Sequence, residues 1–288
     1  MPTTYEKLKA LRVDGMAFSY TPRDVMLYAL SVGMGRDPLD AQELKYVFEK
    51  EPPKVVPTLA CVVSRTNLML TAGLDRTKVV HGEQALRLYR PLPPAAKLVA
   101  SSRVSGVHDK GEGKGVVIYV DTDVKDAETG EALYALRQGI FARGDGGMGG
   151  DAGPAPVPHA MPTRAPDLVM TADTRADQAL LYRLNGDMNP LHADPELAAR
   201  AGYKAPILHG LCTYGVACRE LLSKVCSYDN TVIEEFNVRF TSPVYPGERI
   251  TTHAWIDGDL VSFRCSIKER NKVVIDNGIC RLSPARKA

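Results

Sequence analysis

The sequence predicts an α+β protein made of two similar halves, each built on an antiparallel sheet. Three observations support this fold class: a segment rich in Gly and Pro near the middle of the chain, short motifs that occur in the same order on both sides of it, and runs of strands without intervening helices. Strands in succession favour antiparallel pairing, because a parallel sheet needs a crossover helix between strands. At 288 residues the chain is also long enough for two domains.

The central segment 144–166 reads GDGGMGGDAGPAPVPHAMPTRAP, which is too dense in Gly and Pro to hold a regular element. We therefore divide the chain into an N-terminal domain at 1–143, a linker at 144–166 and a C-terminal domain at 167–288.

The two domains share motifs in a common order, which indicates duplication. Each has a Leu-Tyr-x-Leu sequence, then a turn with Gly, then a Pro-Leu pair, and later a His-Gly pair followed by a Pro-rich stretch. These motifs lie at 27–30, 37–40, 81–82 and 90–98 in the first domain, and at 181–184, 189–192, 209–210 and 242–250 in the second.

Alternating apolar and polar residues, interrupted by turn residues, predict the strands. They span 97–107, 116–124 and 132–141 in the first domain, and 232–240, 249–256, 260–268 and 272–282 in the second. The segment 210–226 has helical periodicity with little polar circumference, which is typical of a buried helix. A buried helix wrapped by an antiparallel sheet is the hot-dog arrangement, and two such domains make a double hot dog.

Bulk properties narrow the function classes. A net charge of +2 argues against binding to nucleic acid or to membrane surfaces, and no apolar run is long enough to span a bilayer. The first seven residues lack the apolar core of a signal peptide, and the tail 285–288 is not a peroxisomal Ser-Lys-Leu signal. Six cysteines without metal-ligand spacing indicate buried thiols in a reducing compartment. We expect a cytoplasmic protein.

The segment 182–195, YRLNGDMNPLHADP, is predicted to be a short loop between two helices. A capping box at 174–177 predicts the start of the first helix, and Gly186 can adopt the left-handed conformation that ends it. Asp194 as cap and Pro195 at the first position predict the start of the second helix.

This loop carries Asp187, Asn189 and His192 close together. A carboxylate and an imidazole held near each other can act as general base and general acid. Asp187 and Asn189 can also be simple turn residues, and Asp194 is assigned only the role of a helix cap. The pair of Asp187 and His192 on so short a loop favours catalysis over the structural alternative.

The residues around this loop resemble a known family. GDMNPLHADP at 186–195 and APILHGLCTYG at 205–215 are similar to the signature of the MaoC-like, or hydratase 2, family of (R)-specific enoyl-CoA hydratases. HGEQALRLYRPLP at 81–93 and HDKGEGKGVV at 108–117 resemble the N-terminal half of the hydratase 2 unit of eukaryotic multifunctional β-oxidation enzymes. The resemblance covers nearly the whole chain.

The resemblance implies hydration of a trans-2-enoyl-CoA to the (3R)-3-hydroxyacyl-CoA, which is reversible. Asp187 and His192 would activate water and protonate C2, and Asn189 would position the pair or the water. The N–H of Gly210, at the start of the buried helix, would receive the thioester oxygen. The thioester is the substrate, so no cofactor and no metal are expected, and the family suggests a homodimer.

The same resemblance implies a set of contacts to the CoA ester, namely His81, Gly82, Lys110, Gly186, Met188, Pro190, Leu191 and Phe240. An ammonium group at Lys110 suits the phosphates of CoA, although this residue also fits an ordinary exposed turn.

The first domain has Gly33 and Asp40 where the second has Asp187 and His192, so it is expected to be non-catalytic. In the family, this half gives up its central helix to accommodate an acyl chain, which implies medium- to long-chain substrates.

Two other functions remain open: a hot-dog acyl-CoA thioesterase, and an acyl-CoA-binding subunit without turnover. A metal site made of Asp187, His192 and His209 lacks further ligands at suitable spacing. Gly111-x-Gly113-x-Gly115 precedes a strand instead of opening a helix, and is therefore not a dinucleotide fingerprint.

Overall fold

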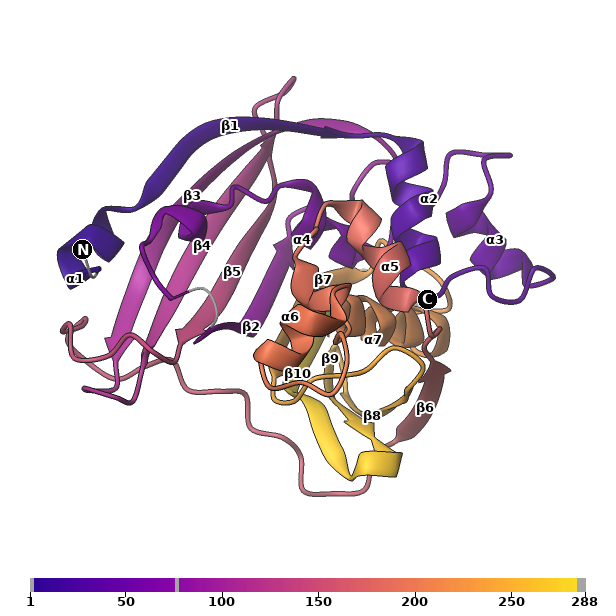
Figure 1. Cartoon of the computed structure of the whole chain (residues 1–288). Helices are drawn as coiled ribbons and strands as arrows, with labels where there is room; N and C mark the ends of the chain where they lie inside the picture. The colour runs from indigo at the N-terminus through magenta and orange to yellow at the C-terminus, as the bar shows by residue number, and fades with distance from the viewer. Residues whose placement is uncertain (1–2, 76–77, 284–288) are drawn as a thin grey trace.

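The computed structural model describes residues 3–75 and 78–283, and its ten strands form one antiparallel sheet (Figure 1). The order across the sheet is β1-β3-β4-β5-β2-β7-β10-β9-β8-β6. The strands are β1 Arg12–Tyr20, β2 Val79–Leu88, β3 Ala96–Asp109, β4 Val116–Asp126, β5 Ala132–Ala142, β6 Leu168–Asp173, β7 Ile233–Phe240, β8 Arg249–Asp257, β9 Leu260–Ile267 and β10 Lys272–Leu282.

The sheet consists of two halves with mirrored strand order. The first five strands of the chain make one half and the last five the other, and the halves join where β2 pairs with β7 between Glu83↔Arg239 and Arg87↔Glu235. The second strand of each half is central, and the first strand of each half lies at an outer edge. The predicted double hot-dog fold is confirmed.

Helices cover one side of this sheet. They are α1 Tyr5–Ala10, α2 Pro22–Ser31, α3 Ala41–Val47, α4 Ala60–Val63, α5 Gln178–Tyr182, α6 Pro195–Arg200 and α7 Gly210–Lys224. Short 3₁₀ segments are η1 Pro57–Leu59, η2 Leu68–Thr71, η4 Arg183–Asn185, η5 Pro190–His192 and η6 Lys268–Arg270.

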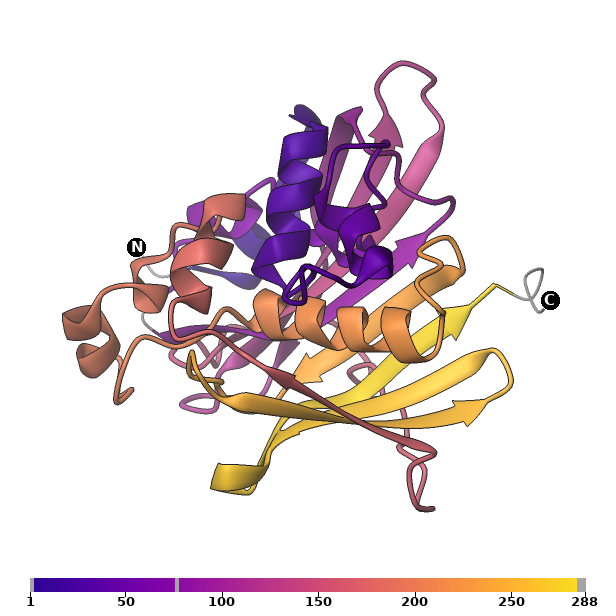
Figure 2. The same ribbon diagram turned by 90° about the vertical axis from the view of Figure 1, so that its right-hand side faces the viewer.

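Helix α7 is the central helix of the second half. Figure 2 shows it lying across the strands of that half, with α2 crossing on its other side. Burial on both sides explains its apolar circumference: Leu211, Tyr214 and Leu221 are each at most 5% exposed. The hydroxyl of Tyr214 donates to the carbonyl oxygen of Phe236 in β7 at 2.6 Å, which ties the helix to the sheet.

Within residues 3–75 and 78–143, the first half has no helix comparable to α7. Between α3 and β2, the described residues form only η1, α4 and η2. The sheet of β3, β4 and β5 is therefore covered by a thin layer of short turns, which leaves room over its inner face.

Two details of the predicted repeat are wrong. His81 and Gly82 lie inside β2, where Gly82 is the extra residue of a register shift against β5, whereas His209 and Gly210 begin α7. Asp40 does not take the place of His192; its carboxylate accepts hydrogen bonds from the N–H groups of Gln42 and Glu43 and caps α3. The Leu-Tyr-x-Leu motifs do correspond, since each lies in the helical segment that follows an edge strand, at α2 after β1 and at α5 and η4 after β6.

The helix that was predicted to begin at Thr174 begins at Gln178 instead. Thr174 does not cap it, because its side chain hydrogen-bonds to the backbone just before β8. Its hydroxyl donates to the carbonyl oxygen of Glu248 at 2.7 Å and accepts from the N–H of Gly247 at 2.9 Å. Gly186 does adopt the left-handed conformation, with φ of +102°. Asp194 caps α6 as predicted, accepting from the N–H groups of Glu196 and Leu197.

The segment 144–166 contains no helix or strand and connects β5 to β6. All six cysteines are buried and unpaired. Within the described ranges no helix has the length and apolarity needed to cross a membrane. The first two residues and the tail 284–288, which entered the predictions about targeting signals, lie outside the described residues.

Candidate active site

The loop between α5 and α6 holds Asp187, Asn189 and His192 in a tightly turned conformation. The carboxylate of Asp187 accepts from the N–H of Asn189 at 3.3 Å, and the side-chain oxygen of Asn189 accepts from the N–H of Leu191 at 3.1 Å. Asp187 and Asn189 therefore act as turn residues, which was the alternative to a catalytic role. Both also line the pocket described below. The two roles are compatible.

His192 is 9% exposed, and its Nδ1 lies 2.8 Å from the carbonyl oxygen of Ile207. A carbonyl only accepts, so Nδ1 carries the proton and Nε2 of the neutral ring has a free lone pair. Burial lowers the pKa of His192, which keeps the ring neutral at pH 7.

His209 stacks on His192 with ring centroids 3.6 Å apart. Its Nε2 donates to the carbonyl oxygen of Asp187 at 3.1 Å, so it holds the backbone of the loop. Burial lowers the pKa of His209 to about 3. A neutral His209 adds no positive charge beside His192, which is compatible with the close stacking.

Arg65 is a member of the site that the sequence did not reveal. It follows α4 in the first half, and its Nη1 lies 2.8 Å from Oδ2 of Asp187. Burial raises the pKa of Asp187, but the charge of Arg65, with smaller contributions from the histidines, more than offsets this and holds the pKa below its usual value. Asp187 is therefore ionised at neutral pH.

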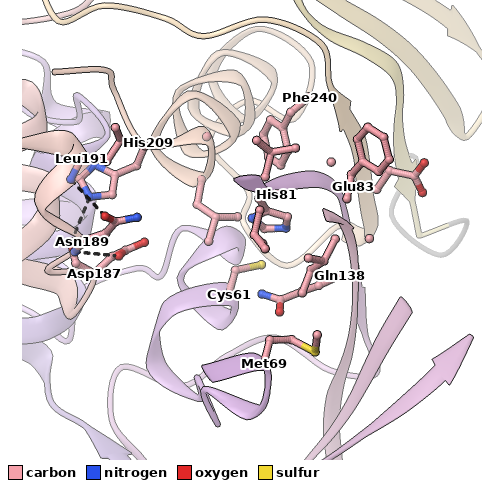
Figure 3. A pocket seen from close by; sticks show the side chains of 18 of the residues that line it. Cys61, Met69, His81, Glu83, Gln138, Asp187, Asn189, Leu191, His209 and Phe240 are labelled. Carbon is pink, nitrogen blue, oxygen red and sulfur yellow. Dashed lines mark hydrogen bonds between the residues drawn. The ribbon is translucent and has the colours of Figure 1, made fainter. Parts of the chain in front are cut away.

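A pocket of about 760 Å³ lies where the two halves meet, and both contribute to its lining. Figure 3 shows Asp187, Asn189 and His209 on one side of it and His81 and Phe240 on the other. The pocket brings together every residue predicted from the sequence, namely His81, Gly82, Lys110, Gly186, Asp187, Met188, Asn189, Pro190, Leu191, His192, Gly210 and Phe240.

Comparison with known proteins agrees with this geometry. Residues 18–144 match the family model of the MFE-2 hydratase 2 N-terminal domain, and residues 158–278 match that of the MaoC like domain. Enoyl-CoA hydratase ChsH3 of Mycobacterium tuberculosis is 37% identical over 292 residues, covering 99% of this chain and 100% of that protein. The peroxisomal enoyl-CoA hydratase 2 of Arabidopsis thaliana is also 37% identical, covering 93% and 92%.

This chain belongs to the MaoC-like, hydratase 2 family. Among solved structures, a MaoC-like dehydratase from Phytophthora capsici superposes with a TM-score of 0.86 at 30% identity, covering 99% of each chain.

In this hydratase 2 chain, Gly210 is the first residue of α7, and the first N–H groups of a helix have no partner within it. Its backbone therefore presents a donor at the pocket wall, at the positive end of the helix dipole. A Cβ at position 210 would lie 3.4 Å from the ring of Phe240, which also lines the pocket.

Basic side chains from both halves line the outer part of the pocket. Lys110, Arg143 and Arg239 are all exposed. The ammonium of Lys110 lies 4.6 Å from the ring centroid of Phe141. Lys110 lies in an exposed turn between β3 and β4 and also lines the pocket. Its position therefore fits both an ordinary turn residue and a contact to the phosphates of CoA.

The inner part of the pocket extends over the sheet of the first half, where no central helix intervenes. Apolar side chains from the turns and from β4 and β5 form most of this branch, which we call the acyl branch; they are Cys61, Leu68, Met69, Val120, Leu136 and Ile140. The apolarity of these side chains suits a hydrocarbon chain.

Asp187, His192 and His209 place potential metal-ligand atoms within 4.8 Å of one another. Nδ1 of His192 and Nε2 of His209 donate to backbone carbonyls, which leaves the other nitrogen of each ring as the candidate ligand atom. However, the cation of Arg65 is paired with the carboxylate of Asp187. A positive group in contact with one of three candidate ligands disfavours a divalent cation there.

Proposed function

We propose that this chain catalyses the reversible, (R)-specific addition of water to trans-2-enoyl-CoA, giving (3R)-3-hydroxyacyl-CoA. The observation that carries the proposal is the arrangement of an ionised Asp187 and a neutral His192 in one pocket beside the N-terminus of α7. Relatives that are 37% identical over almost the whole chain are named enoyl-CoA hydratases, which supports the same activity here.

The proposed reaction uses a water molecule hydrogen-bonded by the Asp187 carboxylate and by Nε2 of His192. Its oxygen attacks C3 while one proton passes to the pair, and electrons move through C2 to the thioester oxygen. The N–H of Gly210 stabilises that oxygen, an interaction typically worth about 3 kcal/mol of the barrier. The proton held by the pair then moves to C2, so that the elements of one water molecule are added.

The CoA portion is proposed to bind along the basic outer part of the pocket, and the acyl chain in the acyl branch. This gives residues 1–143 an accommodating, non-catalytic role, with 144–166 as linker and 167–288 as the catalytic domain. An extended apolar branch favours medium- to long-chain substrates over four-carbon ones. We further propose that the protein needs no cofactor or metal, forms a homodimer and acts in the cytoplasm.

The test is incubation of the purified chain with trans-2-decenoyl-CoA and with crotonyl-CoA, following loss of the conjugated enoyl absorbance and analysing product chirality. We expect the (3R) product, faster turnover of the ten-carbon substrate, and no effect of a chelator. Release of free CoA without hydration would identify a thioesterase, and binding without either reaction would identify a non-catalytic subunit.

Variants of the pair identify the catalytic groups. Asp187→Asn and His192→Gln are each expected to lower kcat by about 10²- to 10⁴-fold, which is the usual contribution of general acid–base catalysis. Asp177→Asn is the matched control, because Asp177 is exposed and forms a surface ion pair with Arg175 at 2.8 Å. Wild-type turnover in both pair variants would refute the assignment.

A further inference from the structure

A row of polar side chains crosses the inner face of the first-half sheet, in the middle of the acyl branch. Ser102 of β3 is paired with Thr122 of β4, and Gln138 of β5 is paired with Gln84 of β2. Thr122 pairs with Leu136, two residues before Gln138, so the four side chains form a diagonal row on one face.

This row interrupts an otherwise apolar surface. On one side of it lies the cluster that contains Val120 and Ile140, and on the other the cluster that contains Tyr134 and Leu136. Thr122 and Gln138 line the pocket together with members of both clusters. In a branch that holds only hydrocarbon, apolar residues at these positions would be more stable, because burying polar groups costs free energy. The polar row therefore indicates a function other than packing against hydrocarbon.

The hydroxyl part of the row is satisfied within the protein. Thr66 donates to Ser102 at 2.8 Å, and the hydroxyls of Ser102 and Thr122 are 2.6 Å apart. These groups have partners and do not require a ligand.

The glutamine part of the row is not satisfied. Gln84 is 1% exposed; its Nε2 donates to the carbonyl oxygen of Ala85 at 2.9 Å, but its Oε1 is buried without a partner. The amide of Gln138 makes no hydrogen bond to any residue in the described ranges, and Figure 3 shows it directed into the pocket toward Cys61 and Met69. His81, on the same face through its pairing with Ile140, likewise has a buried Nε2 without a partner.

The amide of Gln138 is half-buried and lines the pocket, so a ligand that displaces water from it either supplies a hydrogen-bond partner or leaves the amide unpaired at a cost in binding free energy. An amide both donates and accepts. The complementary ligand group is therefore a hydroxyl or a carbonyl, and not a charged group, because neither glutamine would neutralise a charge.

We propose that the acyl branch selects acyl groups that carry a hydroxyl or carbonyl oxygen along the chain, and that Gln138 is the specificity-determining residue which hydrogen-bonds this oxygen. The inference rests on the proposed hydratase function, since it concerns the acyl part of the same substrate. Plain hydrocarbon chains also fit, but they leave the amide of Gln138 without a partner or require a trapped water molecule.

The experiment compares kcat/KM for trans-2-decenoyl-CoA with that for its 6-, 8- and 10-hydroxy derivatives. We expect kcat/KM for at least one hydroxylated substrate to exceed that for decenoyl-CoA by about 2- to 10-fold, because its hydroxyl makes a neutral hydrogen bond to an amide that the plain chain leaves unpaired. Gln138→Met, which keeps length and removes the amide, is expected to abolish that ratio by raising kcat/KM for the plain chain and lowering it for the hydroxylated one. Gln42→Leu is the matched control, because Gln42 lies on the exposed surface of α3, outside the pocket lining, and its side-chain oxygen accepts from the ammonium of Lys45.

A wild-type enzyme that prefers none of the hydroxylated chains would overturn the inference while leaving the hydratase function intact. A preference that persists in Gln138→Met would overturn the assignment to Gln138. Failure to hydrate any of the four substrates would instead refute the proposed function. Because every readout is a ratio between substrates of one protein, a general loss of stability in the variant does not imitate the expected result.

Discussion

The ion pair of Arg65 and Asp187 allows a quantitative test of how the first half changes the pKa of the carboxylate proposed to be catalytic. Replacing Arg65 by Met removes the positive charge 2.8 Å from Oδ2 and leaves the burial of Asp187 in place. Burial alone raises the pKa of a carboxyl, so the pKa of Asp187 is expected to rise in the variant. The acidic limb of the kcat/KM profile then moves to higher pH, because the ionised form is the one that accepts the proton from water.

The size of the effect follows from the geometry. Opposite charges about 4 Å apart attract by about 4 kcal/mol at an effective dielectric constant of 20. The side chains of Arg65 and Asp187 are 31% and 18% exposed, so solvent screens part of the attraction. We therefore use an interaction energy of about 2 kcal/mol. On the acidic limb this corresponds to a loss of kcat/KM of about 10- to 30-fold relative to the wild type.

The assay is the pH dependence of decenoyl-CoA hydration for wild type, Arg65→Met and Arg65→Lys. Arg65→Lys keeps the charge and is expected to fall between the other two. Arg249→Met is the matched control, since Arg249 forms a comparable pair with Asp173 at 2.6 Å on the surface. Superimposable acidic limbs for wild type and Arg65→Met would refute the electrostatic role of Arg65.

Two further predictions concern stability. Gly215→Ala is expected to lower the free energy of unfolding by about 1–3 kcal/mol in urea titrations, because its Cβ would lie 2.5 Å from Cγ1 of Val32 where α7 crosses α2; an unchanged midpoint would contradict this packing. Below pH 6.5 the unfolded chain binds a proton at His209, whereas the buried ring, with its pKa of about 3, stays neutral in the folded protein. This residue therefore contributes a fall of about 1.4 kcal/mol per pH unit in the free energy of unfolding as the pH drops from 6.5 toward 4. Urea titrations at pH 7 and 5 should show a smaller fall for His209→Gln, and equal falls would count against this titration.

The sequence was most informative where local chemistry decides the structure. The strands from β7 to β10 were predicted within one or two residues at each end, since each is bounded by turn residues such as Gly258 and Asn271 in the left-handed conformation. The loop that carries Asp187 and His192 was also predicted, because Gly186, Pro190 and Asp194 fix its conformation through their own backbone preferences.

Long-range contacts were missed, since no local pattern encodes them. Arg65 and Asp187 are 122 positions apart in sequence, and Arg65 lies outside every quoted motif. Strands β1, β2 and β6 were not predicted either. β1 and β6 are edge strands with many exposed residues, and Gly82 disturbs the register of β2. The polar row at Gln138 was invisible for the same reason, because its members come from four strands.

The pairing of β2 with β7 also decides how the protein behaves on dilution. Both strands belong to one chain, joined through the segment 144–166, so their association is intramolecular and does not depend on protein concentration. The pocket takes Arg65 from one half and Asp187 from the other. It should therefore remain assembled at subnanomolar protein, where a site shared between two separate subunits would begin to dissociate.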